Sequence, residues 1–398
     1  MVVKTANLSQ KKDLMVVFKD LEKDPVVSRF YEAISTLQLS DYADFVGALY
    51  KTKTTNWSEY LLSAVLSLEN CCVEYASELH TLPELIQKGA EYELDILSEM
   101  ALVSSDDFGF RNYIAGYDIK QIDFKKEYFD RLDNIGKYGF GDFAKFKMFR
   151  FSMDDRNEKG FVLKPVKYPD PVLFKDLIGY ERPRNEIIHN TKILLSGHLA
   201  SNVLLYGDAG TGKSATVKAI ANEYAKEGLR LIELGKEELH LLPKLLDLLS
   251  GNPLKFILFV DDLSFQDNDD NFSALKAVLE GSVSVRSKNT VIYATSNRRH
   301  IVRETFSSRE GDEIHRQDSM QETISLSERF GIKVYFEKPK KDLYLDIVYG
   351  LAKQYNLDMS EKELALKAEQ FALRKAGRSA RAARQLVEQL SANIGGDE

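Results

Sequence analysis

The spacing of apolar positions changes partway along this chain of 398 residues. Up to about residue 155, apolar residues recur at intervals of three and four over 25–36, 58–78, 83–103 and 118–133. This spacing predicts amphipathic helices and a mainly helical N-terminal domain. From about residue 175, short aliphatic and β-branched runs alternate with helical segments. Such alternation predicts an α/β domain with a parallel sheet covered by helices on both faces.

Five strands and a C-terminal group of three helices are predicted in the second half. The strands are expected at 202–206, 229–234, 255–261, 289–294 and 333–336. Helical spacing after Pro339 covers 341–355, 361–376 and 379–392, which predicts a small helical lid. Pro165, Pro169 and Pro171 exclude a regular helix between the two halves. We therefore expect a helical domain over 1–155, a linker over 156–176, an α/β domain over 177–338 and a lid over 339–398.

Composition narrows the class of protein. A hydrophobic content of 44%, a net charge of −7 and an isoelectric point near 5.6 describe an ordinary globular protein and argue against wholesale nucleic-acid binding. The cysteines, Cys71 and Cys72, are adjacent and match no metal or redox spacing, which favours a reducing compartment. No apolar run is long enough for a membrane span, and the N-terminus lacks the apolar core of a signal peptide. We expect a cytoplasmic protein.

A phosphate-binding loop follows the first strand of the α/β domain. The segment fits G-x-x-x-x-G-K-S/T, the Walker A motif, at every fixed position. Its glycines let backbone N–H groups point at phosphate, its lysine reaches the β- and γ-phosphates, and its serine hydroxyl ligates Mg²⁺. The nucleotide-binding residues predicted here are Gly207, Asp208, Ala209, Gly210, Thr211, Gly212, Lys213, Ser214 and Ala215.

Two carboxylates end the apolar strand FILFV. A buried charge is costly unless it is paired or metal-bound, so Asp261 is predicted to hold magnesium, as the Walker B aspartate does in P-loop proteins. Many ATPases place Glu after it to activate water, whereas this chain has Asp262. Asp262 is the predicted catalytic carboxylate that activates water, and its reach is shorter than that of Glu by about 1.5 Å, one carbon–carbon bond. We therefore expect slow, switch-like turnover.

Further polar residues are predicted to lie within reach of a bound nucleotide. Asn297 ends the next strand, where it can orient water or touch the γ-phosphate. Arg329 precedes the last strand and can serve the phosphate of a neighbouring subunit. Arg378, Arg381 and Arg384 crowd a helix start, where cations are disfavoured unless an anion is bound. Since no guanine-reading Asn-Lys-x-Asp segment is present, ATP is favoured over GTP.

This order of elements resembles the AAA+ ATPases. The segments LLYGDAGTGKS, FILFVDDLSF, LKAVLEG, IYATSNRRH and SERFG are similar to an uncharacterised bacterial AAA+ family, over about 170–395. The Asp-Asp-x-x-Phe element is also similar to that of the replication-initiator branch. The resemblance implies a sheet of order 5-1-4-3-2. It also implies sensor 1 at Asn297, an arginine finger at Arg329, sensor 2 at Arg381, and an adenine pocket at Ile178, Gly179 and Tyr180. Arg378 and Arg384 remain alternatives for sensor 2.

The target of the ATPase is left open by the sequence. Segment 135–152 interleaves aromatic and basic residues, which suits nucleic-acid contact, although Phe143, Phe146 and Phe149 also have the spacing of a buried helical stripe. Segment 304–323 is a long polar stretch that can face a neighbour or a pore. We expect a homo-oligomeric switch or remodeller of a protein client. The alternatives are an initiator- or loader-like ATPase acting on DNA, which Arg298 and Arg299 also motivate, and a nucleotide-gated scaffold with little hydrolysis.

Overall fold

The computed structural model divides into two compact units, Met1–Lys145 and Phe146–Glu398. It describes residues 8–78, 80–109, 116–154, 156–157, 159–263, 270–280, 288–297, 328–375 and 377–393. Within these ranges, no helix has both the length and the apolar content to cross a bilayer.

The first unit is a helical bundle with an aromatic core. Its α-helices are α2 (Pro25–Thr36), α3 (Leu39–Lys51), α4 (Trp57–Ser67), α5 (Cys71–Ser77), α6 (Glu84–Ala101), α7 (Ser105–Phe108), α8 (Phe124–Asp133), α9 (Ile135–Tyr138) and α10 (Gly141–Lys145). Phe30 packs against Trp57 and Phe45 with ring centroids 4.4 and 5.2 Å apart. The indole N–H of Trp57 donates to the Met100 carbonyl at 3.0 Å, so the ring is buried without losing a hydrogen bond. The predicted helical character of this region is confirmed.

The second unit is built on a sheet of seven strands. They are β1 (Met148–Met153), β2 (Phe161–Pro165), β3 (Val203–Gly207), β4 (Leu229–Leu234), β5 (Lys255–Val260), β6 (Thr290–Ser296) and β7 (Ile332–Phe336). Their order is β2-β1-β4-β5-β6-β3-β7, and the pairs among β3 to β7 are parallel. Counted from β3, this is the order 5-1-4-3-2, so the predicted fold class is confirmed.

Strands β1 and β2 lie where the sequence predicted the end of the helical domain and the linker. They form an antiparallel hairpin, and β1 also pairs in parallel with β4. Phe149 and Phe151 are 2% and 1% exposed, because alternate positions of a strand point into the core. The compact units therefore divide at residue 145, not near 155. The three-residue spacing of Phe143, Phe146 and Phe149 does not mark one helix, since α10 ends at Lys145.

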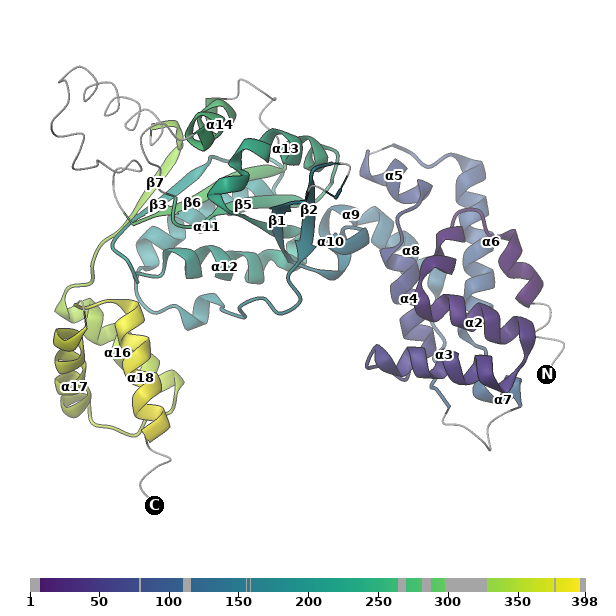
Figure 1. The fold of residues 1–398 in the computed structure, drawn as a ribbon, viewed down its shortest axis with the longest axis horizontal. Helices are drawn as coiled ribbons and strands as arrows, with labels where there is room; N and C mark the ends of the chain where they lie inside the picture. Colours follow the sequence, from purple (N-terminus) through teal and green to yellow (C-terminus); the bar gives the residue numbers. More distant parts are fainter. Residues whose placement is uncertain are drawn as a thin grey trace. The chain divides into compact units, whose positions relative to one another are not determined.

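Helices cover both faces of this sheet and continue into a small C-terminal lid. Figure 1 shows α11 (Glu181–Leu195) and α12 (Lys213–Tyr224) on one face, and α13 (Leu242–Ser250) and α14 (Asp270–Glu280) on the other. The lid comprises α16 (Lys341–Gln354), α17 (Glu361–Arg374) and α18 (Ala380–Asn393). Apolar residues such as Ile347, Leu364 and Val387 form its own core. The predicted lid helices thus lie within two residues of their expected bounds.

Candidate nucleotide-binding site

The phosphate-binding loop lies between the end of β3 and the start of α12. Gly207, Gly210 and Gly212 all have positive φ, at 131°, 76° and 94°, which a residue with a side chain rarely adopts. At Gly207 a Cβ would also collide with the Phe336 carbonyl of neighbouring β7. The glycine pattern therefore follows from the backbone path, which brings the chain to the N-terminus of a 12-residue helix.

Lys213 is buried beneath this loop and surrounded by acceptors. Its Nζ donates to the carbonyls of Gly207 and Asp208 at 2.9 and 2.7 Å, and to Asn297 Oδ1 at 3.2 Å. Burial lowers the pKa of Lys213, and the nearby carboxylates of Asp208, Asp261 and Asp262 oppose that shift. The ammonium group is thus held by neutral acceptors that a phosphate oxygen can replace.

The two carboxylates, Asp261 and Asp262, directly follow β5, beside the end of the neighbouring strand β6. Asp261 Oδ1 accepts from Ser214 Oγ at 2.6 Å and from Thr295 Oγ1 at 2.5 Å. Asp262 Oδ1 accepts from Asn297 Nδ2 at 2.9 Å. Hydroxyl and carboxylate oxygens are the hard ligands that Mg²⁺ uses together with substrate phosphates, so Ser214 and Asp261 fit a magnesium ion.

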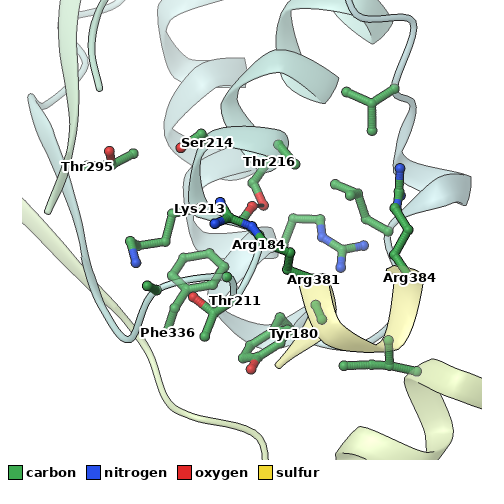
Figure 2. A pocket seen from close by; sticks show the side chains of 18 of the residues that line it. Tyr180, Arg184, Thr211, Lys213, Ser214, Thr216, Thr295, Phe336, Arg381 and Arg384 are labelled. Atoms are coloured by element: carbon green, nitrogen blue, oxygen red, sulfur yellow. Dashed lines mark hydrogen bonds between the residues drawn. The ribbon is translucent and has the colours of Figure 1, made fainter. Parts of the chain in front are cut away.

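A cavity of about 540 Å³ runs from this cluster to the lid (Figure 2). Its polar end is formed by the loop residues 209–216, Asp261, Asp262 and Asn297. Its apolar end is lined by Ile178, Tyr180, Phe336, Ile347 and Leu351. A cavity with one anion-binding end and one apolar end matches a nucleotide, because the triphosphate is anionic and the base is largely apolar.

The predicted base-binding segment forms a tight turn against the lid. Gly179 and Tyr180 both have positive φ, at 74° and 60°. Tyr180 lies against the Phe336 ring with centroids 5.6 Å apart, and its hydroxyl donates to the Glu337 carbonyl at 2.8 Å. A Cβ on Gly350 of α16 would lie 2.6 Å from Ile178 Cδ1, so a larger residue there would require the Ile178 side chain to shift.

The three arginines near the start of α18 differ in their surroundings. Arg378 forms a two-point ion pair with Glu369, at 3.0 and 2.6 Å, and is not among the described residues that line the cavity. Arg381 and Arg384 both line it (Figure 2). The Arg381 backbone N–H donates to the Gly210 carbonyl at 3.1 Å, next to the phosphate loop, whereas Arg384 reaches the Asp176 carbonyl at 3.4 Å. Arg381 therefore stands at the phosphate end.

Arg184 is a cavity residue that sequence reasoning missed. It projects from α11, is 8% exposed, and donates from Nη2 to the Gly179 carbonyl. Its Nε is buried and has no hydrogen-bond partner among the described residues. Burial lowers the pKa of Arg184, and Glu181 opposes the shift. An arginine on an amphipathic helix is usually a surface residue, so no pattern in the sequence marked it.

Other predicted residues lie away from the cavity or outside the described ranges. Arg329 is partly buried before β7 and is not among the described residues that line the cavity. Segment 304–323, together with Arg298 and Arg299, lies outside the described residues.

The sheet order, the phosphate loop and the strand-end carboxylates define an AAA+ P-loop nucleotide-binding protein. More particularly, the chain belongs to the family described as "Protein of unknown function (DUF815)", whose model matches residues 144–394.

Solved structures of RuvB from Thermotoga maritima are similar to this chain at low identity. The one titled as a Holliday junction branch migration motor is 15% identical, with a TM-score of 0.38, and covers 56% of this chain and 66% of that one. A mutant of the same protein is 14% identical, with a TM-score of 0.40, and covers 56% and 67%. The fold assignment rests on the sheet order, since likeness at this level carries no conclusion. Among curated proteins, no significant relative is found.

Proposed function

We propose that this protein binds Mg-ATP and hydrolyses it, acting as an oligomeric switch or remodeller of a protein client. One observation carries the proposal. The Asn297 amide accepts from Lys213 Nζ at 3.2 Å and donates to Asp262 Oδ1 at 2.9 Å. The Asn297 side chain thus links Lys213 of the phosphate loop to Asp262, the carboxylate predicted to activate water.

Each residue has a distinct role in this proposal. Lys213 neutralises the β- and γ-phosphates, and Arg381 adds positive charge from the lid. Ser214 and Asp261 hold magnesium, which would supply electrostatic stabilisation of the transferring phosphoryl group. Asp262 accepts a proton from the attacking water, and Asn297 fixes the position of that water. Ile178, Gly179 and Tyr180 enclose the adenine against the lid.

The remaining parts of the proposal concern assembly and clients. Arg329 acts on the nucleotide of a neighbouring subunit, because it does not line the cavity of its own chain in the described residues. The helical unit over residues 8–145 recruits the client. No specific observation favours DNA as that client: Phe149 and Phe151 of the aromatic, basic segment are buried, so they are not available to stack on bases.

The test is phosphate release by wild type, Asp262→Asn and Arg329→Ala, separately and mixed. Wild type is expected to turn over. Asp262→Asn is expected to bind ATP with wild-type affinity and lose on the order of 10²-fold or more in turnover, because general-base catalysis contributes about that much. In a mixed oligomer, an Asp262→Asn subunit supplies Arg329 to the site of an Arg329→Ala subunit, which retains Asp262. Mixing the two variants should therefore restore part of the activity. Absence of wild-type turnover would leave a nucleotide-gated scaffold, and absence of rescue would contradict the shared site.

A further inference from the structure

The second carboxylate has an unusual backbone conformation. Asp262 has φ 55°, in the left-handed region, directly after strand β5. Few residues with a side chain adopt this conformation, and Asp and Asn are several-fold enriched among them because their short polar side chains tolerate it. A longer acid is less suited to this position.

One side chain of the neighbouring strand holds this turn. Thr295 is 2% exposed, near the end of β6, and β5 and β6 are parallel with Val260 opposite Ala294. The Thr295 hydroxyl accepts the Asp262 N–H at 2.9 Å and donates to Asp261 Oδ1 at 2.5 Å. Its carbonyl accepts the Leu263 N–H at 2.7 Å. Three groups of the β5 end are therefore bonded to one residue.

The turn places the acid beside the sensor. Thr295 is near the end of β6, and Asn297 directly follows that strand, so both residues lie beside the end of β5. Asn297 Nδ2 holds the Asp262 carboxylate at 2.9 Å, while Thr295 holds the backbone of the same residue. The backbone and the carboxylate of Asp262 are thus fixed independently by one neighbouring segment.

We propose that Thr295 is a positioning residue whose hydroxyl fixes Asp262 in the left-handed conformation, and that this turn is what lets the shorter acid serve at this site. The catalytic role of this turn rests on the proposed ATP hydrolysis. The effect of Thr295 on the conformation of Asp262 does not. Thr295 lines the cavity, but its hydroxyl is bonded to Asp261 and to the Asp262 N–H, so it acts through these two residues.

The variant Thr295→Val removes the hydroxyl and keeps the shape. We expect kcat to fall on the order of 10- to 100-fold with KM for Mg-ATP within about three-fold, since a displacement of about 1 Å can cost 10²-fold. Thr295→Ser keeps the hydroxyl and should recover most of the rate. The matched control is Thr191→Val, a buried threonine of α11 that bonds to Tyr293 and does not line the cavity. It should leave kcat within about two-fold.

A crystal structure of nucleotide-free Thr295→Val supplies a second measurement. Asp262 is expected to leave the left-handed region and to lose its bond to Asn297. Asp262→Glu should lower turnover, because glutamate gains reach but fits the turn less well. Wild-type kcat in Thr295→Val with φ still near 55° would overturn the proposal. If wild type itself does not turn over, the ATPase proposal fails, and the structure alone decides the role of Thr295. Should Thr295→Val not fold, Thr295→Ala takes its place in both measurements.

Discussion

The two walls of the nucleotide cavity are organised differently. The core wall, made of Lys213, Ser214, Asp261, Asp262 and Asn297, is a hydrogen-bonded network in which each side chain contacts another member. The lid wall, made of Ile347, Leu351, Arg381 and Arg384, is apolar with two cations, and the Arg381 side chain makes no hydrogen bond to another described residue.

This difference indicates what nucleotide binding must change on each side. On the core wall, the side chains are already held by hydrogen bonds to one another, so the wall is preorganised, and a ligand oxygen takes the place of an existing acceptor. On the lid wall, Arg384 already reaches the Asp176 carbonyl, whereas the apolar side chains and the Arg381 guanidinium are available to a ligand. The core wall is thus suited to chemistry, and the lid wall to sensing which nucleotide is bound.

The largest effect is expected for Lys213→Ala on the core wall. The substitution removes the cation of the phosphate-binding loop. Truncating one partner of a buried charge pair costs about 2–5 kcal/mol, which corresponds to a Kd for ATP weaker by roughly 30-fold to several thousand-fold. A fluorescent ATP analogue titrated with equilibrium detection measures it. Unchanged affinity would contradict the assignment of the phosphate loop.

A smaller effect is expected for Arg381→Ala on the lid wall. A solvent-accessible cation on phosphate contributes about 1.5 kcal/mol, so ATP affinity should fall about ten-fold while ADP affinity changes less. Arg378→Ala is the matched control, three residues away on the same segment and paired with Glu369. It should leave nucleotide affinity within about two-fold. An equal loss in both variants would mean that general lid structure, not phosphate contact, is responsible.

The smallest effect is expected for Arg184, the buried cavity residue of α11. Its Nε–H, which has no partner among the described residues, is expected to donate to the base or ribose, so Arg184→Gln should weaken ATP binding about 5-fold, the effect of one hydrogen bond worth about 1 kcal/mol. Competition by adenosine, which lacks phosphates, locates the contact. If the variant binds adenosine as wild type does but loses ATP, the arginine contacts phosphate instead.

The sequence predicted the core wall better than the rest of the molecule. Residues 207–214 form a local motif, and the glycines at fixed positions indicate the backbone conformation of the loop. Carboxylates that follow an apolar strand need a cation nearby, whatever the position of that strand in the sheet. The roles of Arg184 and Thr295 depend on contacts between distant segments, which no local pattern encodes. The ion pair between Arg378 and Glu369 likewise depends on how the segment before α18 packs against α17, which the sequence does not show.

The hairpin of β1 and β2 was missed for a different reason. Its aromatic residues alternate on strands, but the phenylalanines before it repeat every three residues and favoured helix. Prolines then suggested a linker, although Pro165 is tolerated at the end of an outermost strand, where a missing N–H costs no ladder bond.

That hairpin changes which strand lies at the flank of the sheet. Without it, β4 would present a row of unpaired parallel backbone groups, the kind of edge onto which a strand of another molecule can add. With it, the flank is a five-residue antiparallel strand that ends in proline. This edge disfavours strand addition between two copies of the protein that meet at high local concentration. A contact between copies along that flank therefore depends on side chains and not on backbone hydrogen bonds.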